Sequence, residues 1–262
     1  MSTTDLPVSA DGVTRTPAVT RAPAPSSATA VDEIADGVYR ISTPAPAVPG
    51  GFTFNQILVV DDEPLLFHTG MRSLFPSVRA AVARVIDPAR LRWIGFSHVE
   101  ADECGALNDW LAVAPRAGWI CSRTAAMTSG DIGDRPPRPL ADGEELALGA
   151  KKRVRWLDAP HLPHNWECGY LFESSTRTLL CGDLFTHAGG AELPALTESE
   201  VLSPAEAMRR AMPSSVAIDV HARAMLEKLA ATEPATLALM HGSSYRGDGG
   251  RLLRAFADAL GV

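Results

Sequence analysis

Four short apolar runs in this sequence are each followed by a histidine or a carboxylate. The four pairs are Trp93–Ser97 with His98, Arg153–Asp158 with His164, Thr178–Gly182 with Asp183, and Thr236–Met240 with His241. Runs of this length read as buried strands, and loops at strand ends are where α/β folds place ligand-binding groups. Polar side chains repeated at four such ends therefore predict a layered fold in which separate loops meet around one site.

The remaining pattern alternates strands with helices. Further strands are expected at Val38–Ser42, Phe54–Val60, Pro64–His68, Gly118–Ser122 and Gly169–Glu173, and helices at Leu74–Ile86, Cys104–Leu111, Pro204–Ala211, Val220–Ala231 and Arg251–Leu260. This alternation favours an α/β or α+β sandwich over a helical bundle. Residues 1–31, rich in Ala, Pro, Ser and Thr, are expected to form a disordered tail, and residues 32–262 a single domain.

Composition excludes several classes of function. The chain has 31 acidic and 24 basic residues, with no basic cluster longer than Lys151–Arg153, so nucleic-acid binding is not expected. No segment approaches the ~18 apolar residues of a membrane span. The four cysteines are Cys104, Cys121, Cys168 and Cys181, and no two of them have C-x-x-C spacing. This pattern favours a reducing compartment and a cytoplasmic location.

The stretch FSHVEADECGAL, residues 96–107, places one histidine and three carboxylates within six positions. In an extended loop the alternation would point His98, Glu100 and Asp102 to the same side, and such side chains suit hard metal ions. Taken alone, the stretch reads equally as a solvated acidic turn. The three distant polar side chains at comparable positions favour the metal site.

HVEADECGAL, with the later His164-Asn165-Trp166, Asp183 and His241-Gly242, resembles the metallo-β-lactamase superfamily. The match is closest to the oxygen-binding di-iron domain of flavodiiron proteins, which carries H-x-E-x-D. Tyr245-Arg246 is similar to the aromatic-Arg pair that closes the family pattern. The resemblance covers about residues 34–262 and implies a four-layer αββα sandwich.

The resemblance also implies a role for each matching position. His98, Glu100 and His164 would hold one metal, Asp102 and His241 the other, and Asp183 would bridge the two. His161 competes with His164 for its position, although the adjacent Asn-Trp pair favours His164. Candidate catalytic residues are Asp102 and Tyr245.

This chain departs from the family pattern at two positions. Glu103 stands where the superfamily usually has histidine, so it is either a metal ligand, a group that orients a ligand, or a solvated neighbour. Carboxylates at 100 and 103 make the site harder, which favours iron or manganese over zinc. His68 replaces the usual aspartate and is expected to be structural, with a contact to a metal ligand as the alternative.

Two functions follow from the resemblance. The first is a stand-alone domain with two iron ions that binds or reduces O2 or NO, as a gas sensor or as an oxidoreductase served by a separate flavin or rubredoxin-type electron donor. The absence of a flavodoxin-like segment before Val262 motivates the separate donor. The second is a metal-dependent hydrolase of ester, thioester, lactam or phosphodiester bonds, in which Asp102 orients a metal-bound hydroxide. Two iron ions are expected in the site, with zinc or manganese as the alternatives. Loops Thr128–Pro139 and Ala188–Glu200 are expected to line the pocket.

Overall fold

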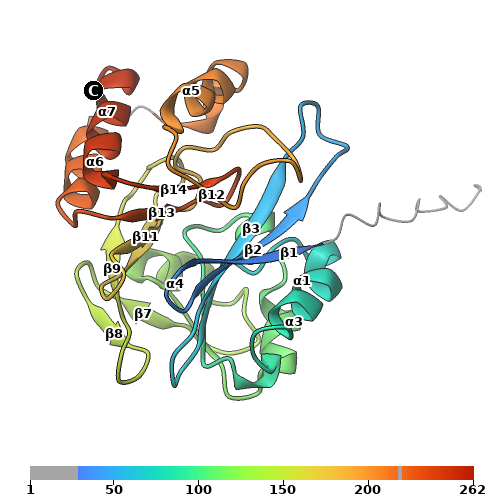
Figure 1. Ribbon diagram of the computed structural model, residues 1–262. Coiled ribbons are helices and arrows are strands. Elements are labelled where there is room, and N and C mark those ends of the chain that lie inside the picture. Colours follow the sequence, from blue (N-terminus) through green and yellow to red (C-terminus); the bar gives the residue numbers. More distant parts are fainter. Residues whose placement is uncertain (1–28, 218–219) are drawn as a thin grey trace, which may run out of the picture.

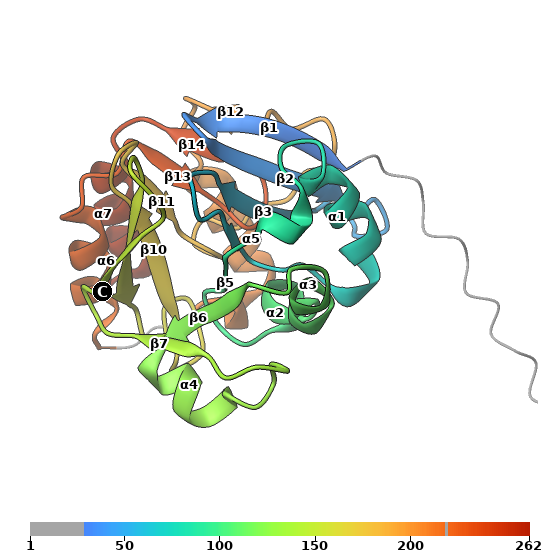
Figure 2. The ribbon, with the colours of Figure 1, turned by 90° about the horizontal axis from the view of Figure 1, so that it is seen from below.

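The computed structural model describes residues 29–217 and 220–262 (Figure 1). Most of the tail expected at residues 1–31 lies outside these ranges. The first strand begins at Ala30, ahead of the expected domain start at Asp32. Two seven-stranded sheets face each other, and helices cover the outer face of each, so the expected αββα sandwich is confirmed (Figure 2).

The first sheet has the strand order β1-β2-β3-β4-β5-β6-β7. Strands β2 to β4 pair antiparallel as the expected meander. Strand β1, which was not expected, pairs antiparallel with β2, and β4 to β7 pair parallel. The strands are β1 (Ala30–Ala35), β2 (Val38–Pro44), β3 (Thr53–Val59), β4 (Leu65–Phe67), β5 (Trp93–Gly95), β6 (Gly118–Ser122) and β7 (Arg138–Leu140).

The second sheet has the strand order β12-β14-β13-β11-β10-β9-β8. Parallel pairing of β11 with β13 brings the ends of these two strands to the same edge. The strands are β8 (Glu145–Ala147), β9 (Arg153–Asp158), β10 (Gly169–Glu173), β11 (Thr178–Leu180), β12 (Leu196–Thr197), β13 (Thr236–Ala238) and β14 (Ser244–Arg246).

The helices form the two outer layers. They are α1 (Phe75–Val82), α2 (Ala101–Cys104), α3 (Leu107–Val113), α4 (Arg123–Ser129), α5 (Leu202–Ala211), α6 (Ala222–Ala230) and α7 (Gly249–Leu260), with 3-10 turns at Arg72–Leu74, Pro88–Arg90 and Pro213–Ser215. No helix among the described residues is long and apolar enough to cross a membrane.

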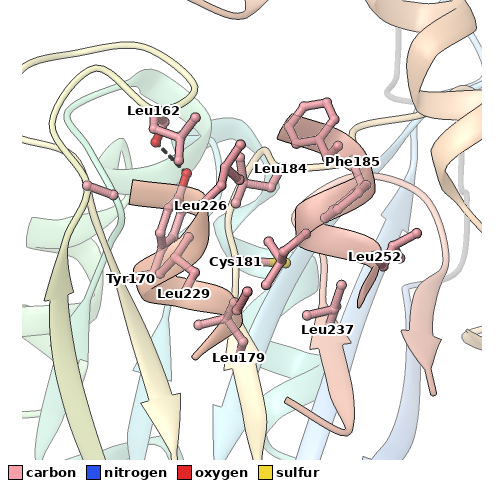
Figure 3. Close-up of a cluster of buried hydrophobic side chains, with 14 of the residues drawn as sticks. Leu162, Tyr170, Leu179, Cys181, Leu184, Phe185, Leu226, Leu229, Leu237 and Leu252 are labelled. Carbon is pink, nitrogen blue, oxygen red and sulfur yellow. Dashed lines mark hydrogen bonds between the residues drawn. The ribbon is translucent and has the colours of Figure 1, made fainter. Parts of the chain in front are cut away.

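Three apolar clusters hold these layers together. One lies between the sheets and includes Phe67 and Trp156. A second joins the first sheet to α1 and α3 through Trp110, and a third joins the second sheet to α6 and α7 through Leu226 and Phe256 (Figure 3). Burial of these apolar faces is the main force that fixes the sheets and helices in place.

The long apolar strands and helices lie close to their expected positions. The short elements β7, β8, β12 and β14 were not expected, because two or three residues carry too little periodicity to identify a strand. Helix α4 was also not expected. All four cysteines are free.

Candidate metal centre

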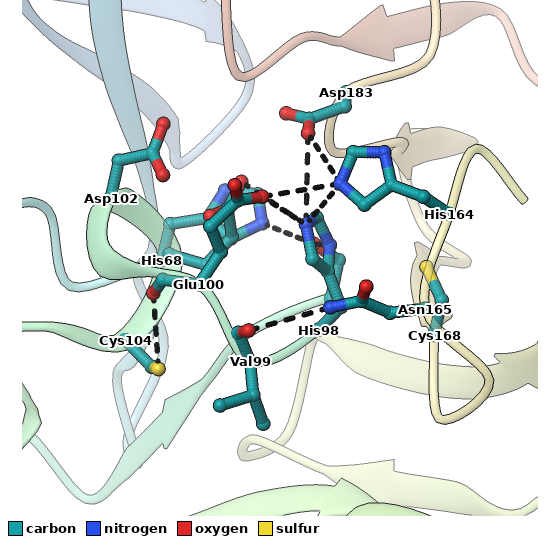
Figure 4. Close-up of polar contacts among 12 residues, drawn as sticks. His68, His98, Val99, Glu100, Asp102, Cys104, His164, Asn165, Cys168 and Asp183 are labelled. Atoms are coloured by element: carbon teal, nitrogen blue, oxygen red, sulfur yellow. Dashed lines mark hydrogen bonds and ion pairs between the residues drawn. The ribbon is translucent and has the colours of Figure 1, made fainter. Parts of the chain in front are cut away.

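Four loops bring the expected ligand residues together at one edge of the sandwich. Figure 4 shows His98, Glu100, Asp102, His164 and Asp183 among them. His98 follows β5, and His164 lies in the loop between β9 and β10. Asp183 follows β11, and His241 follows β13. The side chains gather because these strand ends share one edge of the sandwich, as the sequence pattern predicts.

The acidic stretch after His98 is not the extended loop that its alternation suggests. Glu100 is extended, with φ -144° and ψ 164°, and the helical turn α2 then carries Asp102 and Glu103. A helical turn rotates successive side chains by about 100°. Asp102 and Glu103 nevertheless each place a carboxylate oxygen within 4.8 Å of a ring nitrogen of His241.

The first group of side chains consists of His98, Glu100, His164 and Asp183. The Nε2 atoms of His98 and His164 lie 2.9 Å apart. Glu100 Oε2 lies 3.0 Å from His98 Nε2 and 3.1 Å from His164 Nε2. Metal bonds of about 2.0–2.2 Å place neighbouring ligand atoms roughly 3–4 Å apart, so this spacing is that of one coordination sphere.

The second group consists of Asp102, Glu103 and His241. His241 Nε2 lies 3.4 Å from Asp102 Oδ2 and 3.3 Å from Asp183 Oδ1. The other oxygen of Asp183, Oδ2, lies 3.7 Å from His98 Nε2 and 3.6 Å from His164 Nε2. Asp183 therefore directs one oxygen to each group.

Two of the histidines are held in the tautomer that a metal ligand needs. The Nδ1 atom of His164 lies 2.9 Å from the Ser215 carbonyl oxygen, and that of His241 lies 2.8 Å from the Thr53 carbonyl oxygen. A carbonyl oxygen only accepts hydrogen bonds, so each Nδ1 carries the proton. In the neutral ring, Nε2 then presents its lone pair to the centre.

His98 is oriented by a short relay of side chains. Its Nδ1 atom lies 2.9 Å from Ser97 Oγ, and Ser97 Oγ lies 3.1 Å from His68 Nε2. His68 therefore contacts the candidate ligand His98 through the Ser97 hydroxyl. This agrees with the alternative role considered from the sequence, a contact to a metal ligand. Burial lowers the pKa of His68 to about 3, so its ring is neutral.

The buried carboxylates fit a pair of cations. Both oxygens of the fully buried Glu103 lack a hydrogen-bond partner, and Asp183 Oδ1 makes no hydrogen bond beyond its 3.3 Å ion-pair contact with His241 Nε2. Burial and the neighbouring Asp183 and Asp102 raise the pKa of Glu103 well above its usual value. Because an unpaired buried carboxylate is costly, a cation between these groups would satisfy oxygens that the protein leaves without partners.

Neighbouring charges also shift the pKa values of Asp183 and His241. Burial alone would raise the pKa of Asp183, but contacts with His241, His98 and His164 lower it strongly. Burial alone would lower the pKa of His241, but contacts with Asp102 and Asp183 outweigh it and raise that pKa to about 10. The centre thus attracts positive charge, either as protons or as metal ions.

A cavity of about 720 Å³ opens above the ligand groups. Glu100, Asp102, His164, Asp183 and His241 contribute to its lining. The expected lining loops, Thr128–Pro139 and Ala188–Glu200, do not contribute, and this prediction was wrong. Helix α5 and the turn at Pro213–Ser215 form the wall instead, because the packing of α5 on the second sheet places it over the strand ends.

The other candidates lie outside the cavity lining. His161 is exposed, in agreement with the preference for His164. Tyr245, expected as a catalytic residue, packs against the apolar cluster beneath α6 and α7.

Sequence reasoning missed most of the residues that orient the ligands. His187 is buried, and it links the Asp183 loop to the His241 loop. Ser97 contributes a hydroxyl, and Thr53 and Ser215 contribute carbonyl oxygens. Backbone carbonyls carry no sequence signal, so only the structure could identify the last two.

Comparison with known proteins identifies relatives of this chain. The nitric oxide reductase of Moorella thermoacetica is 24% identical over 242 residues, which cover 86% of this chain and 60% of the relative. The rubredoxin-oxygen oxidoreductase of Megalodesulfovibrio gigas is 26% identical over 211 residues, which cover 76% of this chain and 50% of the relative. The alignment with the diflavin flavoprotein of Thermosynechococcus vestitus covers 60% of this chain but 28% of the relative.

A solved structure gives the same fold. The flavodiiron core of a Synechocystis protein superposes with a TM-score of 0.74 at 20% identity, covering 89% of this chain and 61% of that one. The profile of the family described as ODP family beta lactamase matches residues 52–242, which is most of the described chain. The relatives are flavodiiron proteins, and this chain belongs to the ODP family beta lactamases.

Proposed function

We propose that this chain is a non-haem di-iron domain that binds or reduces O2 or NO. Asp183 carries the proposal, because its two oxygens face two separate groups of ligand atoms at 3.3–3.7 Å. Two cations roughly 3.5–4 Å apart repel each other, and a shared carboxylate between them offsets that repulsion.

Three residues complete each metal position in this proposal. His98, Glu100 and His164 hold the first iron, Asp102, Glu103 and His241 hold the second, and Asp183 bridges both. Glu103 is included because it is fully buried, leaves both oxygens without a partner and has ligand atoms close to those of Asp102 and His241.

The donor set supports iron. Four carboxylates accompany three imidazoles, and hard oxygen donors favour iron or manganese over zinc. When bound, a pair of ferrous ions supplies electrons and open coordination positions for a diatomic gas. The protein holds these ligands in place through the carbonyl contacts of His164 and His241 and limits water through the apolar cavity wall.

Electrons for turnover come, in this proposal, from a flavin or rubredoxin-type donor. The names of the relatives support this, since they include a rubredoxin-oxygen oxidoreductase and diflavin flavoproteins. O2 and NO are proposed as substrates on the same ground.

Metal analysis combined with optical spectroscopy tests the proposal. The chain is purified without oxygen from iron-supplied cells, its metals are measured by mass spectrometry, and its visible spectrum is recorded before and after exposure to O2 and to NO. We expect two iron ions per chain and a spectrum that changes with either gas.

Two variants in one loop sharpen the test. His164→Ala should lower the iron content toward one per chain, whereas His161→Ala, whose side chain is exposed outside the cavity, should keep both irons. Zinc in both positions, with no response to either gas, would contradict the proposal and favour the metal-dependent hydrolase.

A further inference from the structure

The cavity above the metal centre is much larger than a diatomic gas requires. Its volume is about 720 Å³, whereas one water molecule in the liquid occupies about 30 Å³. O2 and NO are of similar size to water. Cavities of roughly 300–1,000 Å³ are typical of sites for small organic molecules.

The walls of this cavity are largely apolar. We call the wall formed by six large side chains the apolar chamber, and its members are Phe52, Met71, Phe185, Met208, Met212 and Phe256. Methionine side chains are flexible and polarizable, so they adapt to apolar ligands of different shapes. Met212 remains 52% exposed, which is unusual for a large apolar side chain and places uncovered apolar surface at the entrance.

The one cationic side chain of the described wall and the hydroxyl of Thr186 are already paired within the protein. Arg209 alone among the described lining residues is Lys or Arg, and Glu206 accepts two hydrogen bonds from it at 2.8 and 2.7 Å. Thr186 Oγ1 donates to the Asp183 carbonyl oxygen at 2.8 Å. Phosphate-rich ligands need free cations, so the chamber does not suit nucleotides, and its largely apolar wall offers few hydrogen-bond partners to a sugar.

Polar chemistry is concentrated at the floor of the cavity. Glu100 is 51% exposed there, and Asp102 and Asp183 also face the space. Hard metal ions held by these groups bind oxygen atoms of a ligand. A molecule that matches both ends of the cavity has one oxygen-bearing head and an apolar body.

We propose that this cavity binds a small organic monocarboxylic or carbonyl compound with an apolar body, with its head at the metal centre and its body in the apolar chamber. The inference rests on the proposed metal centre for the head group alone. The cavity volume, the methionine-rich wall and the paired state of Arg209 carry the rest.

Calorimetric titration with two carboxylates that differ only in their bodies tests the inference. Decanoate has an apolar body, and gluconate has a polyhydroxylated one. The iron-loaded chain, kept without oxygen, should bind decanoate at least tenfold more tightly than gluconate. Equal affinity would overturn the inference. The cavity would then be the place where part of the bound electron donor lies.

A pair of methionine variants shows whether binding occurs in the apolar chamber. Met208→Glu, in the wall, should weaken decanoate binding at least tenfold without changing the iron content. Met127→Glu, whose parent side chain is 76% exposed on α4, should change neither. If both variants keep the original affinity, decanoate binds elsewhere and the inference fails.

The same titration separates this inference from the proposed function. Iron with a gas-dependent spectrum but no preference for decanoate would overturn only the ligand class. A chain without iron would overturn the di-iron proposal. If that iron-free chain still binds decanoate, and Met208→Glu weakens the binding, the result would support the apolar chamber. A chain that takes up neither iron nor decanoate would overturn both.

Discussion

The Nε2 atom of His187 accepts a hydrogen bond from the Ser243 backbone N–H at 3.0 Å, while its Nδ1 atom donates to the Phe185 carbonyl oxygen at 2.9 Å. One buried ring thereby fastens the loop that carries Asp183 to the loop that carries His241. Gly242 lies against this ring with φ +86°, and a Cβ atom there would lie 2.3 Å from His187 Nε2. The absence of a side chain at 242 therefore allows the two loops to meet.

Gly242→Ala should destabilise the protein and disturb the second metal position. The positive φ and the overlap with His187 together should lower the free energy of unfolding by about 2–4 kcal/mol. Gly143→Ala is the matched control, because Gly143 has φ +77° but nothing lies within 4 Å of its added Cβ. Urea unfolding of the chelator-treated chain measures both losses, and equal losses would show that contact with His187 has no effect.

Replacements of Glu103 should change which metals bind. Glu103→Gln keeps the shape but removes a negative oxygen ligand, so the affinity for the second metal should fall at least tenfold. Glu103→His supplies a softer nitrogen donor and should raise the ratio of bound zinc to bound iron. Competition between the two metals, read by mass spectrometry, measures both effects.

Glu173→Gln serves as the control for these variants. Glu173 is also fully buried, but its oxygens accept hydrogen bonds from Ser175 and Thr176 far from any ligand group. Its replacement should reduce stability and leave metal uptake unchanged. Unaltered metal selectivity in both Glu103 variants would show that Glu103 is not a ligand.

Stability of the metal-free chain should fall in acid because of His68. Burial lowers the pKa of His68 from about 6.5 to about 3, so the unfolded chain binds this proton at a pH where the folded chain does not. The contribution of His68 is therefore complete above pH 6.5 and is lost between pH 6.5 and 3, at a slope of up to about 1.4 kcal/mol per pH unit.

His68→Asn should remove that part of the slope. Asparagine tolerates the positive φ of +66° at this position and has no titrating group in this range. Unfolding free energies of both chains at pH 6.5, 5.5 and 4.5, in the presence of a chelator, provide the comparison. Parallel curves for the two chains would contradict the assignment to His68.

Tyr170→Phe should weaken the support of the His164 loop. Tyr170 Oη donates to the Leu162 carbonyl oxygen at 2.5 Å, two positions before the candidate ligand His164 (Figure 3). Loss of a buried hydrogen bond costs about 1–2 kcal/mol, and Cys168 Sγ retains a weaker contact with the same oxygen at 3.1 Å. Thermal unfolding should show a lower midpoint, and an unchanged midpoint would mean that the loop does not depend on this bond.

The strand-end positions of the candidate ligands His98, Asp183 and His241 were predictable, because each of the three follows a strand that its own sequence identifies. The runs before His98, Asp183 and His241 are apolar enough to be recognised as strands, and strand ends that share an edge bring their neighbours together. The sandwich fold followed from the same alternation together with the family resemblance.

The surroundings of the Glu103 side chain could be found only from the structure. Its sequence position allows a ligand, an orienting group or a solvated carboxylate, and these differ only in what surrounds the side chain. Full burial with both oxygens unpaired excludes the solvated position.

The cavity wall was beyond the reach of the sequence for a similar reason. Met208 lies on a helix whose amphipathic pattern shows only that one face is buried, and the packing of α5 on the second sheet decides what that face meets. Local sequence thus determined the ligand types and their strand-end positions, since these depend on short-range periodicity. Tertiary structure alone decided the orientation of those ligands and the wall above them, because both depend on contacts between segments far apart in the chain.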